Sequence, residues 1–136
     1  MNKKNRPLSP HLTIYKPQIT SIMSISHRLS GIFQSVGTVM IFIFFISVFA
    51  GEKYYNLSML FFNSYLGRFF IFLYIFSLCY HMCNGVRHLV WDLGYGFEIK
   101  NVYYSGYITI ATAIILNILV WVLWVWVIEI KKWKIT

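Results

Sequence analysis

Residues 101–128, NVYYSGYITIATAIILNILVWVLWVWVI, are 28 consecutive positions without one charged side chain. Two further charge-free runs precede them, at 29–51 and 69–86, and the three runs together cover 69 of the 136 residues. About 20 mostly apolar residues in a helix, each rising about 1.5 Å, cross a hydrocarbon core about 30 Å thick. The sequence therefore predicts three membrane-spanning helices and has no room for a fourth. Their expected bounds are about 21–50, 67–93 and 103–130.

The composition places the chain in the all-α integral membrane class. It is 58% hydrophobic, 20% aromatic and only 12% charged, whereas charged residues make up about 25% of ordinary soluble domains. A chain of this length forms one domain at most, so residues 1–136 are expected to be a single membrane-anchor domain. Residues 1–20 (MNKKNRPLSPHLTIYKPQIT) form a basic arm whose prolines disfavour a helix, and we expect the arm to lie on a surface.

The basic charge of the chain points to lipid headgroups. Twelve Lys and Arg against four acids give a net charge of +8, and these residues sit at the ends of the apolar runs instead of forming one stripe. Nucleic-acid binding is therefore not expected. Seven basic residues fall on the N-terminal side of the membrane and five on the other, which favours an N-terminus on the matrix or cytoplasmic side.

One face of the second span carries ionisable side chains. In YHMCNGVRHLVWDLGY, residues His81, Gly85, His88 and Asp92 fall within roughly 40° of one line along a helix. Ionisable groups in a membrane are costly unless they meet partners. His81 lies deep, where coordination to haem iron or a hydrogen bond to a neighbouring helix would satisfy its ring, and Gly85 leaves room for a flat ring.

The end of this stripe has a shallower position. His88 is a poorer axial ligand and suits an ion pair or a hydrogen bond, for instance to haem propionates. Two roles stay open for Arg87 and Asp92. They could take part in such an ion pair or hydrogen bond, or they could simply anchor the helix at the membrane interface.

A second stripe begins the first span. In SISHRLSG and its continuation, Ser24, Arg28, Gly31 and Ser35 have the same one-sided spacing, and we expect the two stripes to face each other. A hydroxyl and a guanidinium one turn apart at the membrane boundary suit the polar head of a quinone. The alternative is a capping serine and an arginine held at the headgroups.

Other polar residues carry simpler expectations. Cys79 and Cys83 are typical of packing residues, and Asn117 of a hydrogen-bond donor or acceptor toward a neighbouring helix. Catalytic triads, paired carboxylates, zinc spacings and phosphate loops do not appear. Electron transfer between a cofactor and a lipid-soluble carrier remains.

Two stretches of the chain resemble a known family, the cytochrome b subunits that anchor succinate dehydrogenase, respiratory complex II. The first, Arg6 to Gly31, is similar to an Arg-Pro start followed by Ser-x-x-His-Arg-x-Ser/Thr-Gly. The second, His81 to Gly94, is similar to His-x-x-x-Gly-x-Arg-His-Leu-x-aromatic-Asp. The resemblance implies a part in a hetero-oligomeric helix bundle.

The resemblance also implies roles for single residues. His81 takes the position of an axial ligand to haem b, whose other ligand comes from a second small membrane-anchor subunit. Ser24 and Arg28 match positions that contact ubiquinone. His27 and Arg28, with His88 beside them, match positions near the haem propionates.

The implied function is electron transfer from succinate to ubiquinone, with a flavoprotein subunit and an iron-sulfur subunit docked on the inner side. This chain itself would not touch succinate. Two alternatives stay open, the anchor of a quinol:fumarate reductase and a non-redox membrane adaptor or assembly protein. The polar start, with no amphipathic presequence before Arg6, suits a bacterial plasma membrane or an organelle-encoded subunit of the mitochondrial inner membrane.

Overall fold

Four helices make up the part of the chain that the computed structural model describes, residues 16–133, with the side chains of 127–129 and 131–133 excepted. Three of them are long and apolar enough to cross a membrane, which confirms the predicted all-α fold with three spans. The helices are α1 (Ile19–Phe49), α2 (Glu52–Asn63), α3 (Tyr65–Asp92) and α4 (Ile99–Trp133).

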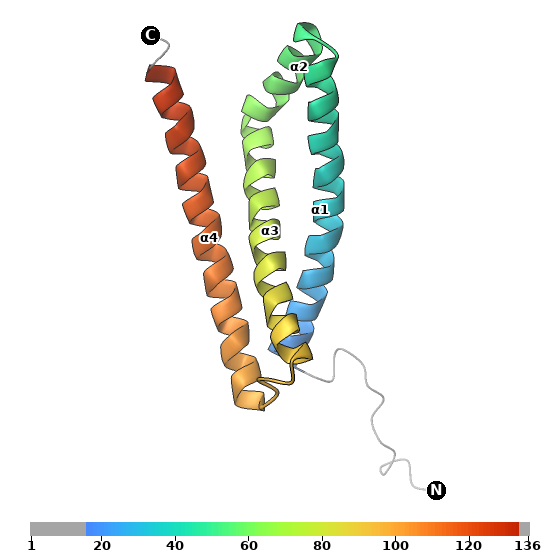
Figure 1. The fold of residues 1–136 in the computed structure, drawn as a ribbon, viewed down its shortest axis with the longest axis vertical. Helices are drawn as coiled ribbons and strands as arrows, with labels where there is room; N and C mark the ends of the chain where they lie inside the picture. Colours follow the sequence, from blue (N-terminus) through green and yellow to red (C-terminus); the bar gives the residue numbers. More distant parts are fainter. Residues whose placement is uncertain (1–15, 134–136) are drawn as a thin grey trace, which may run out of the picture.

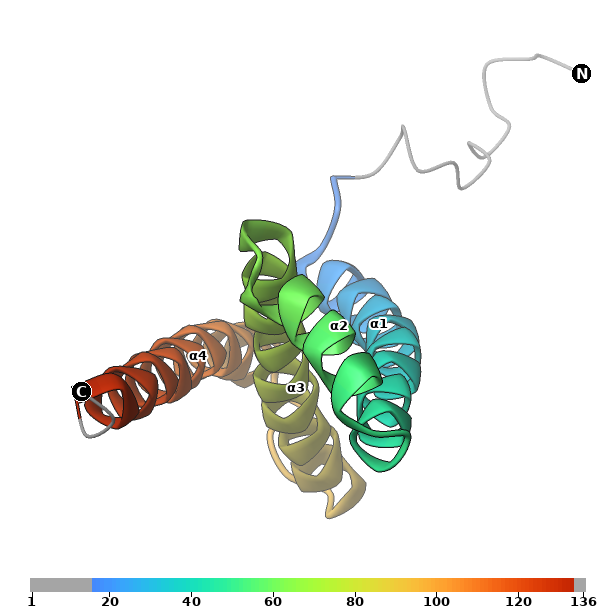
Figure 2. The same cartoon turned by 90° about the horizontal axis from the view of Figure 1, so that it is seen from above.

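Helix α3 occupies the centre of the bundle. Both views place it between α1 and α4, with the short α2 folded over one end (Figures 1 and 2). We call the end where α1 begins, α3 ends and α4 begins the lower end, and the end that carries α2 the upper end (Figure 1). Because α1 and α3 run in opposite directions, the predicted stripe at the start of α1 and the predicted stripe at the end of α3 both lie toward the lower end.

Each of the three spans begins two to four residues before its predicted start. Helix α4 begins at Ile99 and not near 103, because Gly94 and Gly96, with φ of 86° and 80°, complete the turn early. The Val102 N–H then donates to the Glu98 carbonyl at 2.9 Å, which starts the helix. Helix α1 begins at Ile19, inside the predicted arm of residues 1–20, of which 1–15 lie outside the described residues.

Residues Glu52–Asn63 form the short helix α2. A tight corner joins α2 to α3. Ser64 accepts a hydrogen bond from Gly67 N–H at 3.0 Å and donates to the Phe61 carbonyl at 2.6 Å. Gly67 lies so close to this corner that a Cβ there would overlap the Phe61 carbonyl. The glycine is required because backbone, not a flexible side chain, occupies the space.

We therefore expect Gly67→Ala to destabilise the corner. The methyl group forces the backbone of α2 away from α3, and overpacking of this kind costs about 1–3 kcal/mol. Thermal unfolding of the purified membrane complex in detergent would show it as a lower Tm. Leu66→Ala, at a neighbouring position where the side chain is exposed, is the matched control and should leave Tm nearly unchanged. Equal Tm values for the two variants would contradict the steric argument.

The buried core is small and lies where the three long helices meet. It consists of Met23, Cys79, Tyr80 and Ala113. Cys83 packs against this cluster, and both cysteines are free thiols, as expected of packing residues. Most large apolar side chains of the described residues are exposed, so these helices present apolar surface to lipid or to partner helices.

Candidate functional site

The interface between α1 and α3 is built on backbone carbonyls of α1. Three of these, one or two turns apart on one helix face, accept hydrogen bonds from side chains of α3, and we call them the carbonyl row. The pairs are Tyr80 Oη to the Met23 carbonyl (3.1 Å), His81 Nδ1 to the His27 carbonyl (3.2 Å) and Ser77 Oγ to the Ser30 carbonyl (3.0 Å). These bonds fix the rotation of α3 against α1.

His81 has one ring nitrogen inside this network. Its Nδ1 lies 2.9 Å from Ser30 Oγ as well as 3.2 Å from the His27 carbonyl. A carbonyl oxygen accepts and never donates, so the proton of the neutral ring resides on Nδ1. Its Nε2 then carries the free lone pair, and no hydrogen bond from a described residue reaches that nitrogen. The ring is oriented as a ligand to a metal would be.

Two more imidazoles form a cluster with His81, one stacked on its ring and one next to that stacked ring. The His27 ring stacks on it, with centroids 3.8 Å apart and an interplanar angle of 14°. The His88 ring is 5.5 Å from that of His27. His27 Nδ1 is buried without a hydrogen-bond partner among residues 16–133, which leaves a donor or acceptor available to a group from outside. The sequence singled out all three histidines, and the fold brings them together.

The glycines near these rings differ in what surrounds them. A Cβ on Gly31 would lie 3.3 Å from His81 Cε1, so the glycine allows α1 to approach the imidazole. A Cβ on Gly85 would meet nothing within 4 Å, so one side of α3, one turn from His81, is open. These residues fit a haem, because His81 has an oriented Nε2 and Gly85 leaves open space beside it for a flat macrocycle.

A bare metal ion fits less well. No group of three or more His, Cys, Asp or Glu side chains within the described part of the chain could hold one. A haem needs only one axial ligand from this chain, because the macrocycle supplies four nitrogens and a partner can supply the sixth ligand.

The two predicted stripes meet only in part. Gly31 contacts His81, whereas Arg28, Ser35 and Asp92 are exposed. The Ser35 hydroxyl donates to the Gly31 carbonyl within its own helix, at 3.1 Å. Residues on α1 turn by about 100° each, so the side that truly faces α3 is shifted from the predicted stripe by one residue, to Ser30.

Ser24 and Arg28 lie next to each other on the surface of α1. Ser24 is half-buried and Arg28 exposed, and neither makes a side-chain hydrogen bond to another residue of the described chain. One turn separates them, so the hydroxyl and the guanidinium can meet the same small polar group. Arg28 is at the subunit surface and Ser24 is partly so, which suits a site shared with a partner or a lipid-soluble ligand.

Arg87 is not an anchor at the membrane interface. It is only 6% exposed, and its guanidinium lies 4.0 Å from the centre of the Trp91 ring. Its Nε donates to Ser105 Oγ and its Nη2 to the Val102 carbonyl, each at 3.0 Å. It therefore joins the end of α3 to the start of α4. No sequence pattern signals this contact, since hydroxyl and carbonyl acceptors occur in every helix.

Asn117 makes no hydrogen bond to another helix of the described chain. The side chain is 3% exposed, and its Oδ1 has no partner among the residues whose side chains are described. The same side of α4 carries Gly106, Thr109 and Ala113, all buried. Close packing of small residues, and not hydrogen bonding by Asn117, thus holds this part of α4 in place.

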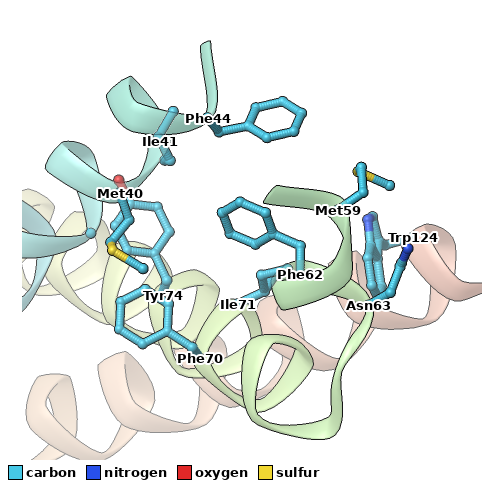
Figure 3. A pocket seen from close by; sticks show the side chains of 11 residues that line it. Met40, Ile41, Phe44, Met59, Phe62, Asn63, Phe70, Ile71, Tyr74 and Trp124 are labelled. Carbon is cyan, nitrogen blue, oxygen red and sulfur yellow. The ribbon is translucent and has the colours of Figure 1, made fainter. Parts of the chain in front are cut away.

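Two cavities between the helices differ in their position along the bundle. A groove of about 680 Å³ between α1, α3 and α4 has Ser30, Ser77 and Tyr80 among its lining residues. A second cavity, of about 390 Å³, lies at the upper end between α1, α2, α3 and Trp124 of α4 (Figure 3). None of the described residues around this second cavity carries a charge or an imidazole. The groove has only hydroxyl groups as polar side chains. The three clustered imidazoles, in the first part of α1 and the second half of α3, therefore locate the candidate site in the lower half of the bundle.

Comparisons with known proteins agree on one family. Residues 2–128 match the family model described as the succinate dehydrogenase/fumarate reductase transmembrane subunit. The succinate dehydrogenase cytochrome b560 subunit of Marchantia polymorpha is 45% identical, over 86% of this chain and 89% of that protein.

Two further relatives come from different lineages. The succinate dehydrogenase cytochrome b556 subunit of Rickettsia prowazekii (strain Madrid E) is 42% identical, over 86% of this chain and 91% of that protein. The mitochondrial succinate dehydrogenase cytochrome b560 subunit of Mus musculus is 40% identical, over 82% of this chain and 67% of that protein. The similarity therefore extends over nearly all of the chain and includes both stripes.

Proposed function

Because the chain belongs to the succinate dehydrogenase/fumarate reductase transmembrane subunit family, we propose that it binds haem b and ubiquinone as the membrane anchor of succinate dehydrogenase. Its relatives make it a succinate dehydrogenase cytochrome b membrane subunit, and three of its helices are able to span a bilayer. The observation that carries the proposal of a haem ligand is the free Nε2 of His81, whose other nitrogen is tied to α1.

In this proposal His81 is one axial ligand of haem b. The second ligand comes from another small anchor protein, so the haem bridges two chains. His27, Arg28 and His88 lie near the propionates. Stacking of His27 on His81 and the unpartnered His27 Nδ1 support this placement, since a propionate oxygen would satisfy a protonated Nδ1. When bound, the haem supplies one-electron transfer.

The quinone site belongs to Ser24 and Arg28. Reduction of ubiquinone to ubiquinol takes two electrons and two protons, and negative charge builds on the carbonyl oxygens until the protons arrive. The Ser24 hydroxyl donates a hydrogen bond that orients one oxygen. The Arg28 guanidinium stabilises the growing charge, which is the larger effect in a site of low dielectric.

The partners follow from this role. A flavoprotein subunit oxidises succinate and an iron-sulfur subunit passes its two electrons on, both docked on the matrix or cytoplasmic side, where the N-terminus of this chain lies. This chain does not act on succinate. The lower half of the bundle, which holds the histidines, Ser24 and Arg28, is then the side nearest to the iron-sulfur subunit.

A visible spectrum of the native complex, isolated through a tag on this chain, tests the proposal. We expect a b-type band in the reduced-minus-oxidised spectrum and copurification of a flavoprotein, an iron-sulfur protein and a second small membrane protein. Reduction of ubiquinone by succinate should follow. An assembled complex without any haem band would leave the adaptor or assembly role instead, and preferred reduction of fumarate by quinol would identify the enzyme as a quinol:fumarate reductase.

A further inference from the structure

We propose that Ser30 is a positioning residue for haem: its hydroxyl oxygen holds Nδ1–H of His81 and so directs Nε2 of the same ring to the iron. This inference rests on the proposed function, since it takes His81 as the ligand. The resemblance to the family assigned no role to Ser30, and the predicted stripes did not include it.

The hydroxyl hydrogen of Ser30 is donated to a single acceptor, the His27 carbonyl. Ser30 Oγ lies 2.7 Å from the carbonyl of His27, and the serine must be the donor in that bond. Toward the imidazole, 2.9 Å away, the same oxygen is therefore an acceptor. Nδ1–H of His81 points between Ser30 Oγ and the His27 carbonyl, with the shorter bond to the hydroxyl.

The position of the Ser30 oxygen is itself well fixed. Ser30 is 9% exposed, and its carbonyl accepts a hydrogen bond from Ser77 Oγ at 3.0 Å. The backbone and the side chain of Ser30 are thus both bonded to α3. The neighbouring Gly31 has no Cβ, and one built there would lie 3.3 Å from His81 Cε1, so the glycine lets the backbone of α1 come close to the ring. An acceptor held this firmly orients a ring better than a mobile one.

The bond has an electronic consequence. Donation of Nδ1–H to an oxygen makes Nε2 more basic, and a stronger donor favours ferric over ferrous iron. Loss of the hydroxyl should therefore raise the reduction potential of the haem and weaken its retention. Loss of such an outer partner of a metal-ligating histidine typically costs about 10–100-fold in metal affinity or activity.

The experiment compares Ser30→Ala, Ser30→Cys and Ser30→Thr in the whole native complex. We expect Ser30→Ala to lose haem to excess apomyoglobin about 10–100-fold faster, with a higher midpoint potential and altered g-values of the oxidised haem in EPR spectra. Ser30→Cys, which keeps the size but has a weaker acceptor, should move the same readouts less. Ser30→Thr keeps the oxygen and should restore them.

Ser47→Ala is the matched control. It removes an equally buried hydroxyl of α1 whose bond to Ser58 Oγ of α2 touches neither Ser30 nor the imidazole, so it should leave the g-values and the potential unchanged. Identical spectra, potentials and rates of haem loss in Ser30→Ala and the unmodified complex would overturn the inference. So would equal shifts in Ser47→Ala, which would reduce the effect to packing. An unmodified complex without haem would instead overturn the proposed function.

Discussion

Replacing His81 by alanine should abolish the b-type absorbance of the purified complex or reduce it to a strongly perturbed remnant. Among the described residues, His81 is the only histidine whose Nδ1 is hydrogen-bonded, to Ser30 and the His27 carbonyl, so that Nε2 carries the free lone pair. Without this imidazole, the chain would lose the residue proposed to hold the haem iron. The measurements are the reduced-minus-oxidised spectrum and the haem content per complex.

His88→Ala serves as the matched control for that prediction. His88 is another half-buried histidine of α3, and its ring packs edge-on against Trp91 with centroids 5.2 Å apart. If His88 contacts only a propionate, the variant keeps its haem band, with a modest shift in potential. An unchanged band in the His81 variant, or loss of the band only in the His88 variant, would exclude the assignment of His81 as the axial ligand.

Arg28→Leu should lower the rate of ubiquinone reduction on the order of 100-fold, because removal of one preorganised donor at a site of developing charge costs about that much. The haem band should persist, as in His88→Ala, since the exposed Arg28 makes no side-chain bond to His81 and is proposed to lie near the propionates. Transfer of electrons from succinate to a soluble dye, which does not need the quinone site, should also be unaffected.

Ser24→Ala should have a smaller effect on the same assay, about tenfold, as expected for one hydrogen bond to a group that gains charge. Arg68→Leu controls for the loss of a surface cation, because Arg68 is exposed near the start of α3 at the upper end. A similar fall in quinone reduction for Arg28→Leu and Arg68→Leu would mean that general electrostatics, and not contact with the quinone, explains the result.

The spans could be predicted from the sequence because length and polarity alone decide them. A charge-free run such as 101–128 has no stable alternative in a bilayer. That His81 has partners on a neighbouring helix was also predictable, since an imidazole deep in a span needs a partner. The bounds were less accurate, because a helix such as α4 continues past the hydrocarbon wherever its backbone bonds are not interrupted.

The details of the site were harder to predict because they depend on how α1 and α3 are rotated against each other. The face of α1 that contacts α3 is shifted by one residue from the predicted stripe and includes Ser30. The pattern of a single helix does not show which residues of another helix it will contact. Arg87 shows the same limit: its buried position follows from the hydroxyl and carbonyl that α4 happens to bring near it.

The carbonyl row makes the tolerance of the two helices to mutation unequal. Its acceptors are peptide oxygens, which no substitution deletes, so Met23 or His27 can change identity while the bonds from α3 persist. The donors Tyr80 and Ser77 have no such protection, because each loses its bond with its side chain. For these three bonds, sequence drift on α1 is thus buffered by its main chain, whereas the side chains of α3 must be kept.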